Sequence, residues 1–248
     1  MLISDPQARA ERSRQNRATV LRFLRNERFS DSATLAKLLS LKSASTARRM
    51  LNGMTKEQLI SRNEFPAYGR KPIVIWGITD HGLAMAFEAD EVMPDNLYPF
   101  RASKFNPITF PHKQGLQCCR IAALHAGWLD WRLASMNEKG LKSADAVAFD
   151  GEQWVAIEYE RTVKARKRYI DIVRYHLEAV RSLQYLKIIY VAPDAAIRDR
   201  IKRFIFELEG RELALSGGVA SLSREILEQL FSFQTLDEFE HDLSRATI

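Results

Sequence analysis

The sequence KSADAVAFDGEQWVAIEYERT, residues 142–162, decides how the second half of the chain folds. Two apolar runs flank Asp150-Gly151, a dipeptide that favours tight turns, so we predict two strands joined into a hairpin. Because side chains alternate between the two faces of a strand, Glu158 and Glu160 lie on the same face. Asp145 enters the first strand, and pairing can bring it beside both glutamates. Three acidic groups converging at a strand end suit a hard divalent cation such as Mg²⁺.

An alternative interpretation of the two glutamates needs no metal ion. Carboxylates on an apolar strand face are costly unless a positive charge compensates them. Glu158 and Glu160 can lie on a solvated face, or they can form ion pairs with Arg161, Lys164 or Arg166. The basic residues at 164–168 open a predicted helix over 164–182. Acids beside a cation in a cleft are candidates for a functional site, which favours the functional interpretation.

Composition excludes several classes of protein. The chain has 248 residues, a net charge of +6 and the apolar and charged fractions of a globular protein. It lacks the run of about eighteen apolar residues that a membrane span needs. Its first residues are polar and arginine-rich, unlike a signal peptide. The adjacent Cys118 and Cys119 are its only cysteines and lack the spacing of zinc ligands. We therefore expect a cytoplasmic protein without structural disulfides.

The positive charge is concentrated in the first third of the chain. Residues 1–88 contain 15 Lys and Arg against 8 Asp and Glu, whereas residues 89–248 contain 22 against 23. This asymmetry indicates an anionic polymer as the partner of the first third. Segment 89–111 contains Pro94, Pro99, Pro107 and Pro111, half of all prolines, and is the best linker candidate. We predict a first domain over 1–88, a linker over 89–111 and a second domain over 112–248.

The first domain is predicted to contain three helices followed by a hairpin with a basic tip. The helices fall at 6–27, after the caps Ser30 and Asp31, and at 44–53, and the strands fall at 59–62 and 73–76. This order resembles a winged helix-turn-helix, whose third helix enters the major groove of DNA while the wing contacts the backbone or minor groove. Carried over, the resemblance assigns DNA contacts to Ser43, Ser45, Thr46, Arg48 and Arg49 of the third helix and to Tyr68, Arg70 and Lys71 of the wing. A basic helical face without DNA, or a protein-binding winged helix, is the alternative.

The second domain is predicted as a helix, three strands, a helix, a strand and a helix, giving a mixed sheet flanked by helices in an α+β or α/β chain. This order resembles the PD-(D/E)xK nuclease fold. Ala144-Asp145 stands where that family has Pro-Asp, and Glu158-Tyr159-Glu160 stands where it has Asp/Glu-x-Lys. Glu160 departs from the family lysine, but some restriction enzymes of the family share the Glu-x-Glu variant. Lys164 is a candidate for a lysine that has moved along the chain.

A narrower resemblance covers nearly the whole chain. A winged helix followed by Asp145 and by Glu158, Glu160, Arg161 and Thr162, with a tyrosine on the next basic helix, is similar to the MobC plasmid mobilisation proteins. These are relaxases of the MOBC class, related to the replication-relaxation family. The resemblance implies a protein that binds double-stranded DNA at a plasmid origin of transfer and nicks one strand. It also implies accessory mobilisation proteins of a relaxosome as partners.

The resemblance implies a role for each candidate residue. Asp145 and Glu158 would hold Mg²⁺ or Mn²⁺, and Glu160 would complete the metal shell or act as the base that orients a water molecule. Lys164 would stabilise the pentavalent phosphate. His112 is either a cap or surface residue or a residue close to the phosphate. Three arginines would hold the DNA backbone, namely Arg161, Arg166 and Arg168.

Two questions about function stay open at the level of sequence. The nucleophile is a water or a tyrosine, and we favour water because no tyrosine stands in a recognisable histidine cluster. The protein as a whole is a nicking enzyme or a non-enzymatic DNA-binding regulator of plasmid replication or transcription with an inactive nuclease-like domain. The missing lysine at position 160 is the main support for the regulator. A restriction-type enzyme that cuts both strands is a weaker third possibility.

Overall fold

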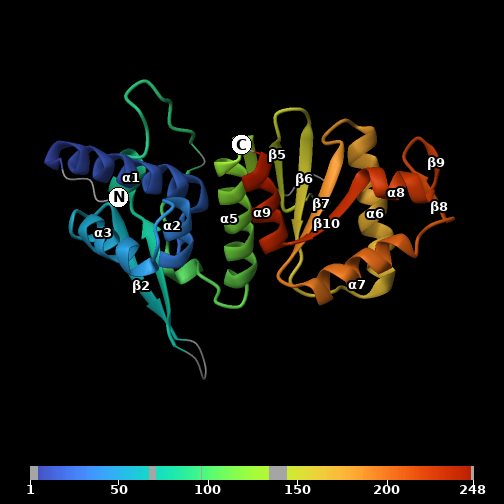
Figure 1. Cartoon of the computed structure of the whole chain (residues 1–248), viewed down its shortest axis with the longest axis horizontal. Coiled ribbons are helices and arrows are strands. Elements are labelled where there is room, and N and C mark those ends of the chain that lie inside the picture. Colours follow the sequence, from blue (N-terminus) through green and yellow to red (C-terminus); the bar gives the residue numbers. More distant parts are fainter. Residues whose placement is uncertain (1–4, 67–70, 96, 134–143, 247–248) are drawn as a thin grey trace. The chain divides into compact units, whose positions relative to one another are not determined.

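The computed structural model describes residues 5–66, 71–95, 97–133 and 144–246 (Figure 1). The chain forms two compact units, residues 1–117 and 118–248, and each is described by itself. Helices and sheets occur in both, so the protein is a mixed α and β protein. No helix in the described ranges is both long enough and apolar enough to cross a membrane.

The first unit contains a small antiparallel sheet and several helices. Its strands lie in the order β1-β3-β2, although β1 is separated from the other two by two helices in the sequence. The elements are α1 (Pro6–Glu27), β1 (Phe29–Ser30), α2 (Ser32–Leu38), α3 (Ala44–Lys56), β2 (Ile60–Phe65), β3 (Ile73–Ile78), α4 (Asp80–Ala84) and the 3-10 helix η1 (Ala102–Lys104).

Side-chain caps fix where the helices of the first unit begin. Asp31 accepts hydrogen bonds from the backbone N–H groups of Ala33 and Thr34, and Ser43 accepts one from Thr46. Ser30, which the sequence also offered as a cap, is instead buried in β1. The sequence prediction of a turn at 54–56 is wrong, because α3 continues to Lys56 to bury Met54 beside Leu51 on its apolar face.

The proline-rich segment belongs to the first unit. The ring of Phe100 lies 5.1 Å from that of Phe29, and the ring of Phe105 stacks at 4.1 Å on Phe65. Gly77 of β3 is needed for this packing, since a Cβ atom there would lie 2.1 Å from the Phe100 ring. Aromatic contacts therefore hold the segment against the sheet, and the boundary between the units falls inside α5 (Phe110–His125).

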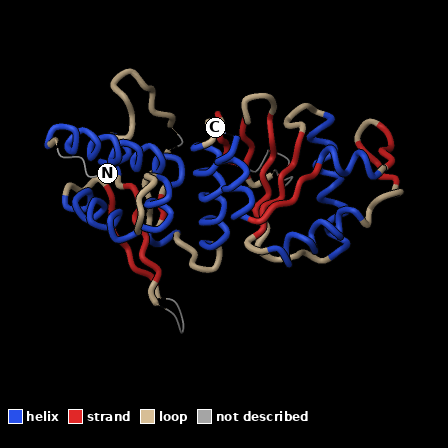
Figure 2. Tube along the Cα trace, in the orientation of Figure 1, coloured by secondary structure: helices blue, strands red, loops and turns tan. Residues whose placement is uncertain are grey.

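The second unit is built around a five-stranded mixed sheet, which lies between helices (Figure 2). Its strand order is β10-β7-β6-β5-β4. β4, β5 and β6 form an antiparallel meander, and β7 and β10 continue the sheet in parallel to β6. The strands are β4 (Leu129–Leu133), β5 (Ala146–Phe149), β6 (Trp154–Tyr159), β7 (Lys187–Ala192) and β10 (Phe231–Thr235).

Helices cover both faces of this sheet (Figure 1). One face carries α6, α7 and α8, and the other carries α9 and the part of α5 that belongs to this unit. A two-stranded hairpin of β8 and β9 lies outside the sheet. The bounds are α6 (Arg166–Arg181), α7 (Ala195–Phe206), β8 (Glu212–Leu215), β9 (Gly218–Ser221), α8 (Arg224–Leu230) and α9 (Leu236–Ala246).

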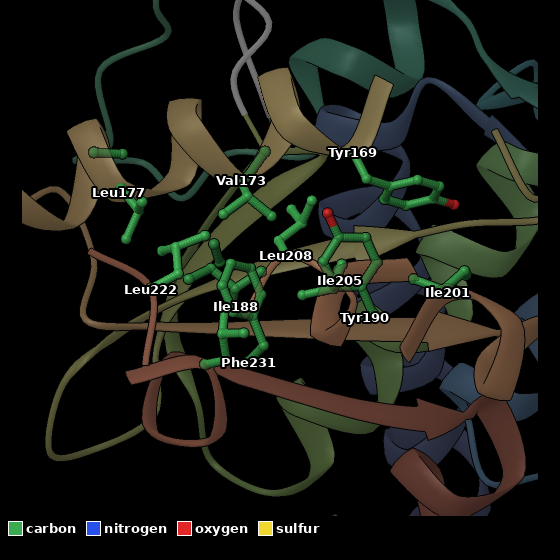
Figure 3. Close-up of a cluster of buried hydrophobic side chains, with 14 of the residues drawn as sticks. Tyr169, Val173, Leu177, Ile188, Tyr190, Ile201, Ile205, Leu208, Leu222 and Phe231 are labelled. Carbon is green, nitrogen blue, oxygen red and sulfur yellow. The ribbon is translucent and has the colours of Figure 1, made fainter. Parts of the chain in front are cut away.

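The main core of the second unit fills the space between α6, α7 and the sheet (Figure 3). Tyr169, Val173 and Leu177 follow one another at intervals of four residues, so they line one face of α6. They pack against Ile188 and Tyr190 of β7, whose alternate residues point to this face. The core thus fixes which way every second side chain of the neighbouring strand β6 points.

Candidate functional site

Asp145 is held at the start of β5. Its Oδ2 atom accepts a hydrogen bond of 3.0 Å from the backbone N–H of Tyr159 on β6. Ala146 pairs with Ile157 in the antiparallel ladder, so the register places Asp145 next to Glu158. The sequence placed Asp145 inside the strand, whereas β5 begins one residue later. Its carboxylate accepts a hydrogen bond from the backbone of the neighbouring strand.

Glu158 lies near the end of β6 and is 8 % exposed. It is opposite Tyr190 in the parallel pairing of β6 with β7, so both side chains point toward α6. The Oε1 atom of Glu158 is 3.5 Å from Nε2 of His176, a residue of α6 that is completely buried. A nearly buried carboxylate is stable only with such polar contacts.

Glu160 and Lys164 form an ion pair at the end of β6. The backbone N–H of Glu160 continues the sheet by donating to the carbonyl of Val191, and the side chain is 7 % exposed. Lys164 lies in the loop before α6, which begins at Arg166 and not at residue 164 as the sequence suggested. Its ammonium group therefore reaches back over four residues to the carboxylate, as one of the two sequence interpretations expected.

The predicted centre of three acidic ligands is not formed in the described ranges. No group of three or more His, Cys, Asp and Glu side chains there is arranged to hold a metal ion. Glu160 is paired with Lys164 in this structure. Asp145 and Glu158 remain adjacent oxygen donors, and Mg²⁺ is commonly held by one or two carboxylates together with substrate phosphates. The pair thus fits an open site completed by phosphate, and it does not form a closed cage.

Burial favours the protonated phenol form of the tyrosines around the site. Burial raises the pKa of Tyr190 well above its usual value, and the nearby Glu158 and Asp145 raise it further. Burial also raises the pKa of Tyr169 and, together with Glu158, that of Tyr175. Tyr159, on the opposite face of the sheet, has a pKa raised to about 12, mainly by burial and then by Cys119 and Cys118 of α5. Phenolate formation at these positions is therefore unfavourable near neutral pH.

Basic residues follow the acidic pair along the chain. Arg161 is half-buried, and Arg166 forms an ion pair of 2.7 Å with Glu207, the residue that caps the C-terminus of α7. Glu207 lines an open cleft of about 440 Å³ between α7 and α8, together with Asp199, Lys202, Arg203, Phe206 and Arg224. The arginine predicted to grip DNA at position 166 is therefore engaged with a carboxylate in this structure.

The DNA-contacting residues predicted in the first unit divide into two groups. The outer side chains of α3 and its cap are all exposed, namely Ser43, Ser45, Thr46, Arg48 and Arg49. Of the predicted wing residues, Lys71 is exposed, whereas Tyr68 and Arg70 fall outside the described residues. His112 lies in the first turn of α5 and belongs to the first unit, while Asp145 and Glu158 belong to the second.

Sequence reasoning missed His176. It occupies the buried face of α6 between Val173 and Leu177, where a single histidine is most simply a core residue. Its partners are the hydroxyl of Tyr185, 2.8 Å from Nδ1, and the hydroxyl of Tyr190, 3.3 Å from Nε2. One sequence signal could have indicated this residue. His176 lies within the apolar stripe of α6, and that stripe covers the strand that carries Tyr190, the residue paired with Glu158.

Comparison with protein-family models, curated proteins and solved structures gives no match for this chain.

Proposed function

We propose that this protein is a metal-dependent DNA-nicking enzyme of the relaxase type, acting in the cytoplasm at a plasmid origin of transfer. The observation that carries the proposal is the grouping at the end of β6. There Asp145 bonds to the Tyr159 backbone, Glu158 lies beside it in register, and the ion pair places Lys164 at Glu160. Two oxygen donors next to an ammonium group suit a phosphodiester substrate.

The arrangement of the second unit supports this proposal. Its order α5, β4, β5, β6, α6, β7 has an antiparallel meander followed by a helix and a parallel strand. That order agrees with the PD-(D/E)xK resemblance noted from the sequence. The position where that family has its lysine is Glu160, and the ammonium of Lys164 is bound to that side chain. We take Lys164 to supply the positive charge that the family places two residues after its second acidic residue.

The first unit supports DNA binding. The order α1, β1, α2, α3, β2, β3 and the sheet order β1-β3-β2 agree with a winged helix-turn-helix. In such a domain α3 enters the major groove. Its exposed hydroxyl and guanidinium groups can bond both base edges and phosphates. Double-stranded DNA is therefore the proposed partner, with accessory relaxosome proteins assembled on the same DNA.

The chain's own residues have distinct parts in the proposed reaction. Asp145 and Glu158 would hold Mg²⁺ or Mn²⁺, which supplies Lewis acidity and lowers the pKa of a bound water. Lys164 stabilises negative charge that develops on the phosphate, and Glu160 keeps its ammonium group in place. Arg161 binds the adjacent DNA backbone. A water molecule forms a new bond to phosphorus while the bond from phosphorus to the 3′ or 5′ oxygen breaks, and the proton that the water loses passes through solvent to that oxygen. The raised pKa values of Tyr169 and Tyr175 disfavour a phenolate as the nucleophile in place of water.

A nicking assay on supercoiled plasmid carrying the cognate origin tests this proposal. With Mn²⁺, the wild-type protein should yield open circles, and EDTA should prevent this. D145N and E158Q should lower the nicking rate by at least about 100-fold, because each removes one charged oxygen donor. E152Q changes an exposed glutamate in the loop of the same hairpin and serves as the matched control. Equal nicking by E158Q and E152Q would refute the proposed site.

A DNA-binding regulator without enzymatic activity is the second candidate. The ion pair between Glu160 and Lys164 favours it, because it neutralises both side chains near the proposed site. This candidate predicts DNA binding by the wild-type protein with no metal-dependent nicking under any of these conditions. Linear products would instead indicate an enzyme that cuts both strands.

A further inference from the structure

The outward face of α7 carries two closely spaced arginines. Arg200 and Arg203 are exposed, and with Glu207 at the C-terminal cap they follow one another at intervals of three and four residues. Side chains at these intervals share one face of a helix. Ile201 and Ile205 of the same helix are buried in the core of the second unit, so this face points away from the core. We call Arg200 and Arg203 the basic stripe of α7.

The carboxylates of the same helix do not neutralise the charge of the basic stripe. Asp199 forms an ion pair of 2.8 Å with the arginine that precedes it, and Glu207 forms one of 2.7 Å with the first residue of α6. Within the described ranges, neither Arg200 nor Arg203 forms an ion pair with an acidic side chain. Like charges on neighbouring positions of a helix repel each other, and a bound anion relieves that repulsion. The basic stripe therefore suits an anionic partner.

Aromatic side chains connect the basic stripe to the candidate site. The guanidinium groups of Arg200 and Arg203 lie 5.7 Å and 5.5 Å from the centre of the Phe204 ring. That ring lies 5.7 Å from the ring of Tyr169 on α6, which Figure 3 shows at one end of the core cluster. The Tyr169 hydroxyl in turn accepts a hydrogen bond of 3.3 Å from the backbone N–H of Lys164. The stripe is thus linked by direct contacts to the loop that carries Lys164.

We infer that Arg200 and Arg203 bind the phosphate backbone of the DNA beside the candidate site, as a contact surface separate from α3. The inference rests on the proposed function, because the DNA held there is the substrate of Asp145 and Glu158. The planar fork of a guanidinium group matches the oxygen atoms of a phosphate. Three residues of a helix advance about 4.5 Å, so the two long side chains can reach phosphates of the same strand. Contacts of this kind fix the position of the DNA and read no sequence.

A pair of double variants with equal net charge tests the contact. R200Q/R203Q removes the basic stripe, whereas R174Q/R211Q removes two exposed arginines elsewhere on the second unit, one in α6 and one before β8. Fluorescence anisotropy with a labelled duplex, in EDTA and at several salt concentrations, measures DNA affinity without divalent metal ions and without cleavage. We expect R174Q/R211Q to keep the wild-type slope of log affinity against log salt concentration. R200Q/R203Q should reduce that slope by about 2, because each arginine contacts one phosphate.

A third variant separates the loss of charge from a loss of structure. R200K/R203K keeps both positive charges, so it should keep the wild-type slope, and thermal unfolding checks that every variant folds. Over a fourfold rise in salt concentration, the affinity of the wild-type protein should fall about 10-fold more than that of R200Q/R203Q. A slope in R200K/R203K as low as that of R200Q/R203Q would overturn the inference, because the charge would then not be the cause.

Nicking of supercoiled plasmid by the wild-type protein in Mn²⁺ distinguishes a failure of this contact from a failure of the proposed function. If the wild-type protein nicks DNA while R200Q/R203Q and R174Q/R211Q have equal salt slopes, the enzyme stands and the contact is refuted. If R200Q/R203Q lowers the slope while the wild-type protein does not nick, the contact is supported and the proposed chemistry is refuted. A wild-type protein that does not bind DNA would refute both.

Discussion

The pair formed by Glu160 and Lys164 has the largest consequences at the scale of single residues. Glu160 is nearly buried, and the ammonium group of Lys164 compensates its charge. The partners lie four residues apart across the loop that joins β6 to α6, so the pair also fixes that loop. Tyr169 of α6 adds a second tie, because its hydroxyl accepts a hydrogen bond of 3.3 Å from the Lys164 backbone N–H.

Removing the lysine alone should therefore cost more than removing both charges. K164M leaves a buried carboxylate without its cation, and we expect the free energy of unfolding to fall by about 1–3 kcal/mol. The double variant K164M/E160Q should lose less than the sum of the two single losses. Urea denaturation of the wild-type protein, K164M, E160Q and K164M/E160Q measures this coupling between the two side chains. Strictly additive losses would show that the pair contributes nothing of its own.

Glu238 provides a residue-scale test of the electrostatics. Its side chain contacts Arg198 and accepts a hydrogen bond from the Thr235 backbone, and these contacts lower its pKa from 4.5 to about 2. A lowered pKa stabilises the folded state above about pH 4.5, and this contribution is lost as the pH falls toward 2. The contribution is small because the carboxylate is 46 % exposed. A carboxyl titration by NMR should find this low pKa, and R198M should raise it; an unchanged value in R198M would contradict the account.

At the scale of elements, α3 carries the exposed face that we propose contacts a DNA duplex. Its buried residues Ala47, Leu51 and Met54 fix the helix, so Arg48 and Arg49 point outward. Because α3 carries no acidic residue in its first turn, the positive end of its helix dipole favours a phosphate group.

Loss of the two arginines should weaken DNA binding in a salt-dependent manner. If each contacts one phosphate, R48A/R49A reduces the slope of log affinity against log salt concentration by about 2. R14A is the control, because Arg14 is an exposed arginine of α1 that is paired with Glu11. Fluorescence anisotropy with a labelled duplex at several salt concentrations measures the slopes. Equal slopes for R48A/R49A and R14A would exclude α3 as the contact surface.

Some elements were predictable from sequence for clear physical reasons. The residues of β5, β6 and β7 form apolar runs that are bounded by turn signals, and β10 spans the residues expected for it. The helix α9 was missed because its pattern is largely polar and Phe239 is its one fully buried aromatic residue in the described ranges. The hairpin of β8 and β9 was missed because its side chains are mostly exposed, including Val219. A short hairpin with exposed side chains leaves little periodic signal.

Strand periodicity predicted only the part of the candidate site that lies on β5 and β6. Alternation along β6 and the antiparallel register account for the neighbourhood of Asp145 and Glu158. The sequence could not decide whether Glu160 is a third metal ligand or a member of an ion pair. The ion pair depends on the path of the loop that carries Lys164. His176 was beyond reach, since its contact with Glu158 arises from the packing of α6 on two strands.

At the scale of the whole molecule, the two units divide the proposed task. The first contains the outward residues of α3 and most of the excess positive charge, whereas the second contains the acidic pair at the end of β6. Binding and chemistry should therefore be separable by substitution: R48A/R49A affects affinity, and E158Q affects the nicking rate of bound DNA. The central claim is that Asp145 and Glu158 together bind a divalent ion.

Anomalous X-ray diffraction from crystals soaked in millimolar Mn²⁺ tests that claim most directly. The account predicts an anomalous peak in contact with the carboxylates of both Asp145 and Glu158, and its absence from crystals of E158Q. A map with no peak at these carboxylates, or with a peak there that persists in E158Q, would contradict it.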